Sequence, residues 1–179
     1  MNLQKWDERY LQMAALVASW SKDPRAKVGA VIVRNNRVVA TGFNGLPSEV
    51  LDNQDRLIDK RIKLEMTVHA EENALIVAGI NAEGATIYLH GKPVCARCAG
   101  SIIQAGIRRV VAMHPETSDD KRSAWREVGL IALAMLGEAG IKFHAKAIES
   151  QKYNGKNADK SNVENKAEPE AVTVLSTSH

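Results

Sequence analysis

Apolar residues near the start of the chain recur at the spacing of a helix. Between residues 5 and 20 the large apolar side chains return every three or four positions, which is typical of one buried helical stripe. The charged residues Asp7, Glu8 and Arg9 fall on the solvent side of this stripe. Core packing is expected for its members, which are Trp6, Tyr10, Met13, Leu16, Val17 and Trp20. Pro24 follows and cannot extend the helix.

The next segment predicts a β-hairpin. Residues 28–33 are almost wholly apolar, as in a strand that is buried on both faces, and residues 37–43 form a second strand-like run. Asn35 and Asn36 separate the two runs, and a short loop containing Asn favours a hairpin turn. Residues 48–66 are charged and weakly periodic, so we expect a loop with a short helix there.

Helices and strands then alternate, which is typical of an α/β fold. The three predicted helices each end before a glycine and span residues 70–78, 96–105 and 121–139. The three predicted strands span residues 85–89, 109–113 and 141–145. Alternation of this kind implies parallel neighbouring strands with helices on the sheet faces. We therefore predict a three-layer α/β/α fold with a five-stranded mixed sheet that begins with the hairpin.

The composition divides the chain into a folded body and a polar tail. Residues 1–148 contain all the predicted elements, and residues 149–179 contain almost no large apolar side chain before Val172. A segment of this kind cannot bury enough surface to offset its ordering entropy. We therefore expect one domain over residues 1–148 and a disordered tail over residues 149–179.

Charge and apolar content exclude some classes of partner. The net charge of +3 is too small to favour nucleic acid, and no apolar run approaches the roughly 18 to 20 residues that cross a bilayer. The first residues are charged and lack the apolar stretch of a signal peptide, so a cytoplasmic protein is expected. The two cysteines are Cys95 and Cys98, and a reducing compartment leaves a redox pair or metal ligation as their roles.

Two short motifs carry the chemistry of the sequence. Cys95 and Cys98 face the same way when they lie on the first turn of a helix, whose positive end favours thiolates. His69 and Glu71 are two residues apart and would point to opposite sides of a continuous helix. They converge on one metal if His69 lies at the cap and Glu71 in the first turn. Two helix N-termini would then meet.

This set of residues fits a catalytic zinc site. Three protein ligands leave a fourth tetrahedral position for water, and zinc lowers the pKa of that water towards about 7. Glu71, which is not a ligand, could take a proton from the water and pass it to a ring nitrogen and a leaving amine. Either motif alone is weak, but in this order and at two helix starts they favour hydrolytic deamination.

The motifs resemble the cytidine and deoxycytidylate deaminase family, whose signature is His-x-Glu followed by Pro-Cys-x-x-Cys. The resemblance covers residues 5–145 and is nearest to the deoxycytidylate branch. It rests on residues 21–24, 28–33, 41–47, 69–74 and 102–107. It implies zinc bound by His69, Cys95 and Cys98, and Glu71 as the proton shuttle. It also implies Asn44 on the sugar of a nucleotide substrate, a homo-oligomer, and in many members control by deoxynucleoside triphosphates.

The sequence departs from the family pattern at three places. Val94 stands where the family has Pro before the first cysteine, which leaves the ligands intact but could alter the loop over the substrate. The stretch before His69 lacks an aromatic pair. Ala99 and Gly100 resemble the branches that act on guanine or on tRNA adenosine. The leading prediction is dCMP to dUMP. The alternatives are a purine base or tRNA adenosine as substrate, or a non-catalytic zinc- or nucleotide-binding module.

The weaker predictions concern the surroundings of the site. Asn44, Ala70 and Arg122 are expected to contact substrate, although Asn44 is also a turn former by residue type. Arg122 follows the end of a strand, where ligands often bind in α/β sheets, and Arg25 is a similar phosphate candidate. Four further residues are expected to be structural or solvated. Glu72 and Arg109 would face solvent, Asn73 would hold the neighbouring loops, and Trp125 would lie in the core.

Overall fold

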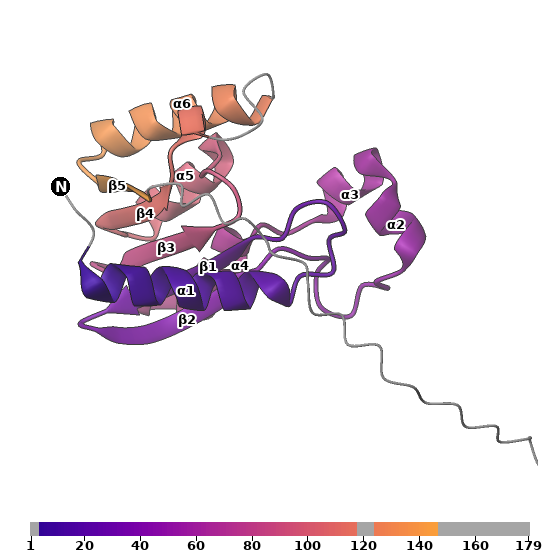
Figure 1. Cartoon of the computed structure of the whole chain (residues 1–179), viewed down its shortest axis with the longest axis horizontal. Coiled ribbons are helices and arrows are strands. Elements are labelled where there is room, and N and C mark those ends of the chain that lie inside the picture. Colours follow the sequence, from indigo (N-terminus) through magenta and orange to yellow (C-terminus); the bar gives the residue numbers. More distant parts are fainter. Residues whose placement is uncertain (1–3, 118–123, 147–179) are drawn as a thin grey trace, which may run out of the picture. The chain divides into compact units, whose positions relative to one another are not determined.

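The computed structural model describes residues 4–117 and 124–146, and it shows a mixed five-stranded sheet between helices (Figure 1). The strands are β1 Gly29–Arg34, β2 Arg37–Phe43, β3 Thr86–His90, β4 Arg109–Met113 and β5 Lys142–Lys146. Their order in the sheet is β2-β1-β3-β4-β5. β1 is antiparallel to both neighbours, and β3, β4 and β5 are parallel. The predicted boundary at residue 148 and the tail over residues 149–179 lie outside the described residues.

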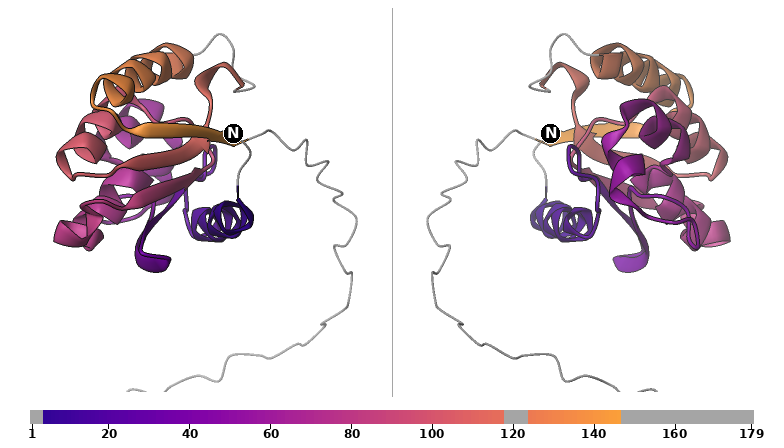
Figure 2. Two further views of the ribbon diagram at one scale, coloured as in Figure 1. Left: turned by 90° about the vertical axis from the view of Figure 1, so that its left-hand side faces the viewer. Right: turned by 90° about the vertical axis from the view of Figure 1, so that its right-hand side faces the viewer.

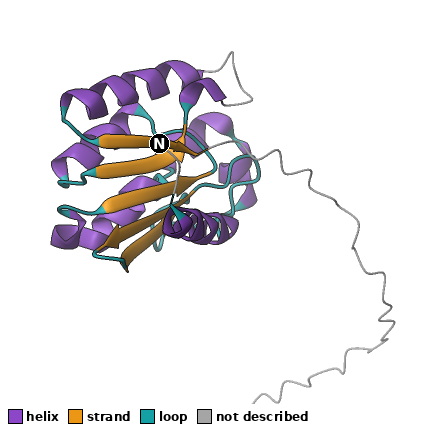
Figure 3. Cartoon of the chain, turned by 60° about the vertical axis from the view of Figure 1, so that its left-hand side comes forward, coloured by secondary structure: helices purple, strands orange, loops and turns teal. Residues whose placement is uncertain are grey.

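The helices agree closely with the predicted segments, except that residues 121–123 of the helix predicted over 121–139 lie outside the described residues. They are α1 Lys5–Ser19, α2 Gln54–Ile58, α3 Lys60–Met66, α4 Ala70–Ala78, α5 Ala96–Gln104 and α6 Ala124–Glu138, with 3-10 turns η1 Gly79–Ala82 and η2 Pro115–Thr117. α1 covers one face of the sheet, and α4, α5 and α6 cover the other (Figures 2 and 3). The predicted three-layer α/β/α fold is confirmed.

Two cores follow from the alternation of side chains along the strands. Val31, Tyr88 and Val111 pack with α1 on one face of the sheet. Ile32 and Ile87 point to the other face and pack with α4, α5 and α6. Because both faces of the middle strands are covered, these strands are apolar almost without interruption.

The hairpin prediction is confirmed. β1 and β2 are antiparallel, and the turn between them is formed by Asn35 and Asn36, both of which have positive φ, at 51° and 59°. Asn tolerates the left-handed region, and two such residues match the twist of the flanking strands.

The predicted buried stripe of α1 is wrong at three positions. Trp6, Leu16 and Trp20 are 53%, 60% and 52% exposed. The buried stripe is instead Asp7, Tyr10, Leu11, Ala14, Val17 and Ala18. Small residues face the sheet because helix and strand approach closely, and a Cβ on Gly29 would lie 2.2 Å from the Ala14 carbonyl oxygen. The prediction weighed large side chains and overlooked the alanines.

The expectation that Asp7 and Arg109 face solvent is also wrong. Both carboxylate oxygens of Asp7 accept hydrogen bonds from the Arg109 guanidinium, at 2.7 and 2.8 Å, and Asp7 is buried. The Tyr88 hydroxyl donates a third bond, at 2.8 Å. The Arg109 hydrogen bonds hold the pKa of Asp7 well below its usual range. The pair joins α1 to β4 on the face of the sheet that α1 covers.

Residues 48–66 contain two short helices where one was expected. Asn53 caps α2 by accepting a hydrogen bond from the Arg56 amide, and Asp59 caps α3 by accepting from the Ile62 amide. Asn and Asp are preferred caps because their side-chain oxygens satisfy the free amides at a helix start. The break between the helices follows from Asp59, which has extended backbone angles. Among the described helices, none combines the length and the apolar content that a membrane span needs.

Candidate metal centre and active site

His69 stands at the N-cap of α4, as the spacing of His69 and Glu71 predicts. Its backbone is extended, with φ −72° and ψ 154°, so its side chain leaves the helix axis in a direction that a helical residue could not take. The preceding residue, Val68, pairs with Gly45 in an isolated β-bridge. A second contact fixes α4 on the sheet, because a Cβ on Gly42 would lie 2.4 Å from the Ala74 amide nitrogen. Only glycine allows that approach, which brings His69 to the site.

Cys95 and Cys98 lie at the start of α5. Cys95 is the N-cap, also with extended backbone, and its Sγ accepts a hydrogen bond from the Cys98 amide at 3.5 Å. The sulfur therefore takes the place of the usual capping oxygen. Both cysteines are buried. The N-termini of α4 and α5 meet, as predicted, and each supplies part of one ligand set.

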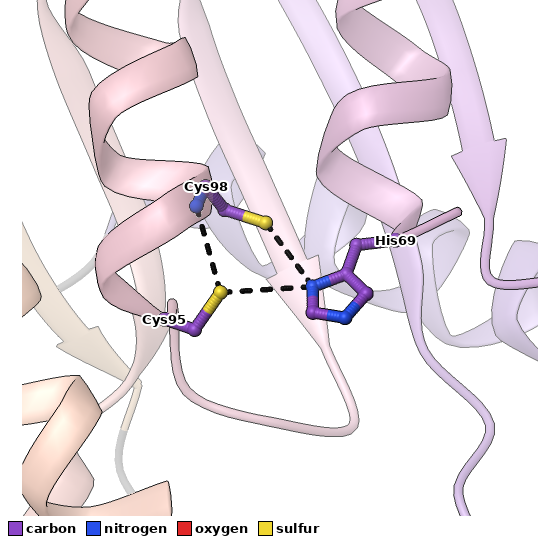
Figure 4. Close-up of side chains that lie close together, drawn as sticks. All are labelled: His69, Cys95 and Cys98. Atoms are coloured by element: carbon purple, nitrogen blue, oxygen red, sulfur yellow. Dashed lines mark hydrogen bonds between the residues drawn. The ribbon is translucent and has the colours of Figure 1, made fainter. Parts of the chain in front are cut away.

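The three side chains converge with the spacing that zinc requires (Figure 4). Nδ1 of His69 lies 3.2 Å from the sulfur of Cys98 and 3.6 Å from that of Cys95, and all three ligand atoms lie within 4.8 Å of one another. Tetrahedral zinc, with Zn–N near 2.05 Å and Zn–S near 2.3 Å, implies N···S separations of about 3.6 Å. The residues therefore fit zinc.

The electrostatics of the two thiols differ. The pKa of Cys95 is lowered to about 4, mainly because its thiolate accepts a hydrogen bond from Cys98 and, with a smaller effect, from His69. The same hydrogen bond raises the pKa of Cys98, and burial raises it further. One thiolate therefore forms readily and favours a cation at the centre, whose charge is needed to release the second proton.

Glu71 lies in the first turn of α4 and is 4% exposed. Burial raises its pKa to about 7, with smaller opposing and reinforcing effects from His69 and Cys95. A carboxyl group with a pKa near neutrality can both accept and donate a proton at the pH of a cell. Its position two residues from a ligand is the one that the proton-shuttle hypothesis requires.

A pocket of about 560 Å³ opens over the centre. His69, Ala70 and Glu71 lie in its wall, together with the ring of Trp125, whose centroid is 6.0 Å from that of His69. Four cationic side chains also line it: Arg25, Lys60, Lys63 and Lys92. The volume suits a small molecule, and the lining favours an anionic one with a flat ring.

The three expected substrate contacts have different settings. Asn44 lines the pocket but is already engaged, since its Oδ1 accepts from the Val28 amide at 2.8 Å and its Nδ2 donates to the Ala26 carbonyl at 2.9 Å. Ala70 lies fully buried in the wall of the pocket. Arg122 lies outside the described residues. A substrate contact stays a prediction for all three.

Glu72 is not the solvated helix residue that was expected. One of its carboxylate oxygens accepts a hydrogen bond from the His69 amide at 3.2 Å, and the other lies 3.3 Å from Nε of Arg97. Asn73 behaves as expected, because its Nδ2 donates to the Phe43 carbonyl at 2.8 Å and so ties α4 to the end of β2.

Sequence reasoning missed four residues of the pocket wall, which are Trp125 and the lysines Lys60, Lys63 and Lys92. Trp125 packs against the core, as predicted, but also lines the pocket. Lys63 is buried and paired with Asp23 at 2.8 Å. The sequence offered one indication for Lys63, which is that it lies in a short helix just before His69. Asp23 and Lys63 are 40 residues apart, so sequence spacing alone did not pair them.

Comparison with known proteins gives the chain its family. A sequence model of the cytidine and deoxycytidylate deaminase zinc-binding region matches residues 4–114. The chain belongs to the cytidine and deoxycytidylate deaminase family. It is 44% identical over 140 residues to an uncharacterised deaminase in the luxG 3' region of Aliivibrio fischeri, covering 78% of this chain and 92% of that protein.

Three further relatives and one solved structure extend the comparison. The chain is 35% identical over 146 residues to human deoxycytidylate deaminase, covering 78% of each chain. It covers only 40% of the length of each of two yeast deoxycytidylate deaminases. The dCMP deaminase of cyanophage S-TIM5 in apo form has a TM-score of 0.61 at 24% identity, covering 81% of this chain and 100% of that one. This last likeness shows the shared fold.

The protein thus belongs to a zinc-binding family, and its His69, Cys95 and Cys98 are positioned so that they could hold the metal. The unusual Val94 is buried in the core, and it is Lys92 and Pro93 that line the pocket. Proline is thus kept beside the site but one residue earlier than in the family pattern.

Proposed function

We propose that this deaminase hydrolyses dCMP to dUMP and ammonia. The observation that carries the proposal is the position of buried Glu71 beside the His69, Cys95 and Cys98 centre, in the wall of a pocket with a cationic lining. The deoxycytidylate deaminases among its relatives support the choice of substrate. The identity of 44% to a deaminase of unknown substrate supports the chemistry alone.

The residues divide the reaction between them. His69, Cys95 and Cys98 would hold zinc, which would lower the pKa of a bound water molecule so that it can act as a nucleophile near neutral pH. Glu71 accepts a proton from this water as its oxygen attacks C4 of cytosine, and delivers that proton to ring N3. It then transfers the second proton of the water to the amino group, which leaves as ammonia. The Trp125 ring lines the pocket beside His69, with the two ring centroids 6.0 Å apart, and offers a flat surface to the base.

The cations of the pocket suit the phosphate of a nucleotide. Lys63 is neutralised by Asp23, which leaves Arg25, Lys60 and Lys92 for an anionic substrate. Arg25 and Lys60 are exposed and therefore lie towards the rim, whereas Glu71 is buried. A nucleotide with its base at Glu71 would place its phosphate among these cations.

The substrate is tested by ammonia release from zinc-loaded protein. The panel is dCMP, CMP, dCTP, cytidine, guanine and an adenosine-containing RNA, and we expect the highest kcat/KM for dCMP. Arg25→Ala and Lys60→Ala should each raise the KM for dCMP about tenfold, the effect of about 1.4 kcal/mol. Arg34→Ala removes a charge at the far end of β1 and is the control. Release of ammonia from guanine or RNA but not from dCMP would show that dCMP is not the substrate. Release from none of the compounds would contradict the proposed reaction.

Three further properties are proposed on the same basis. A homo-oligomer, which the resemblance implies, is supported by the exposed apolar side chains of α1. Control by deoxynucleoside triphosphates is implied by the resemblance alone and is tested by adding dCTP and dTTP to the dCMP assay. A cytoplasmic location is supported by the two free cysteines, since a reducing compartment keeps both available to zinc.

A further inference from the structure

The N-termini of α4 and α5 are joined by a contact that lies outside the ligand set. Oε1 of Glu72 lies 3.3 Å from Nε of Arg97. Glu72 is three residues after His69 in α4, and Arg97 lies between the two cysteines in α5. The other oxygen of Glu72 accepts a hydrogen bond from the His69 amide. One carboxylate therefore holds the backbone of one metal ligand and a side chain from the segment that carries the other two.

We propose that Glu72 and Arg97 form a clamp that positions the two ligand-bearing helix starts for zinc. Neither residue is a ligand, and both act through the residues beside them. Packing of α4 and α5 on the sheet brings the two helix starts near each other, and the clamp adds a direct link between them at the level of the ligands. With it, the three ligand atoms are held together before the metal binds, which lowers the ordering cost of binding.

Because both side chains are partly exposed, we expect loss of the pair to change zinc affinity more than folding stability. Arg97 is 60% exposed and Glu72 is 22% exposed, and ion pairs at such positions contribute about 1 kcal/mol or less to folding. Loss of groups that orient metal ligands typically costs about 10- to 100-fold in metal affinity. For this pair we expect a loss of affinity near the lower end of that range, about tenfold, because the pair is exposed to solvent.

The test is the zinc affinity of the full-length protein, measured by competition with a chromophoric chelator. Arg97→Ala should weaken the affinity about tenfold, and Arg97→Lys, which keeps the charge, should restore part of the loss. In the Glu72→Gln background Arg97→Ala should have less than a twofold further effect, because the partner charge is already gone. The Co²⁺ absorption bands of each variant report whether the ligand geometry is kept.

A matched control comes from a second ion pair. Arg126→Ala removes an exposed contact of 3.1 Å to Glu116 and should leave zinc affinity unchanged. Zinc affinity within twofold of wild type for Arg97→Ala, in protein with an unchanged melting temperature, would overturn the clamp. The inference rests on the zinc centre of the proposed function and not on its substrate. Failure of dCMP to react would therefore leave the affinity result standing.

Discussion

Burial gives the carboxyl group of Glu71 a pKa at which it can both accept and donate a proton. At Glu71 the surrounding protein raises the pKa of the carboxyl to about 7, whereas at Asp7 hydrogen bonds from Arg109 lower it. Both carboxyls are buried, and the difference lies in the partner, because a hydrogen-bonded guanidinium stabilises the ionised form of Asp7, whereas for Glu71 the loss of hydration on burial is the largest effect. Residue type alone therefore does not decide the role of a buried acid.

Replacing Glu71 tests the proton-shuttle role. Glu71→Gln keeps the size of the side chain but cannot accept a proton, so kcat for ammonia release should fall at least about 10³-fold, as expected when a general acid–base is lost. Zinc content should stay at that of the wild type because Glu71 is not a ligand. Activity within tenfold of wild type in zinc-loaded Glu71→Gln would contradict the mechanism.

The Asp7 and Arg109 pair predicts a specific dependence of stability on pH. Because the pKa of Asp7 is lowered from 3.8 by folding, its contribution is complete above about pH 5 and is lost as the pH falls through the folded-state pKa. Asp7→Asn should lower the free energy of unfolding by about 3 kcal/mol at pH 7. It should also flatten the loss of stability between pH 5 and pH 3.

Urea unfolding at several pH values measures this effect. The control is Asp52→Asn, which removes an exposed pair with Lys22 and should change stability by less than about 0.5 kcal/mol. Equal pH dependence in Asp7→Asn and wild type would show that another group dominates acid unfolding.

At the scale of elements, the metal centre depends on how closely α4 lies against β2. The caps His69 and Cys95 set the directions of the ligands, but it is Gly42 that lets the helix approach the strand. The geometry of the site therefore depends on the absence of a side chain at position 42 as well as on the ligand residues.

Gly42→Val tests this dependence. The new Cβ would lie 2.4 Å from the Ala74 amide nitrogen and 2.5 Å from the Ala70 carbonyl oxygen, so α4 must move away from the sheet. We expect a loss of about 2 kcal/mol or more in the free energy of unfolding and a weaker zinc affinity. Gly45→Ala is the control, because its nearest neighbour is a side-chain atom at 3.9 Å. A zinc affinity equal to that of the wild type in Gly42→Val would show that the metal site does not depend on the close packing of α4 against β2.

What the sequence could predict was local. The convergence of His69, Cys95 and Cys98 was predictable because each lies at a helix start and the motif that contains it also sets its direction. The hairpin was predictable because Asn35 and Asn36 carry their turn conformation with them. The charged pairs were not, since Asp7 and Arg109 are 102 residues apart and each reads as a surface residue without its partner.

At the scale of the whole molecule, α1 is the sole helix on its face of the sheet within residues 4–117 and 124–146 (Figure 3). Trp6 and Leu16 on this helix and Trp20 at its C-cap are all more than half exposed. Scattered apolar side chains are common on surfaces, but three large ones along one helix and its cap favour contact with another copy of the chain.

Sedimentation velocity tests this assignment. The wild-type protein should sediment as an oligomer, and Leu16→Glu should shift it towards the monomer because the new charge would lose its hydration at the contact. Gln104→Glu introduces the same charge at an exposed position of α5 and should have no effect. Identical sedimentation of Leu16→Glu and wild type would place the contact elsewhere.

The spacing of the ligands gives zinc a mechanical role as well. His69 and Cys98 are 29 residues apart, and the chain between them forms α4, η1 and β3. A metal held at both ends closes this stretch into a ring, which in the loop-closure treatment of cross-links removes about 3.6 kcal/mol of freedom from the unfolded chain. Bound zinc would therefore stabilise the folded protein as a disulfide does, through a segment that includes the central strand β3.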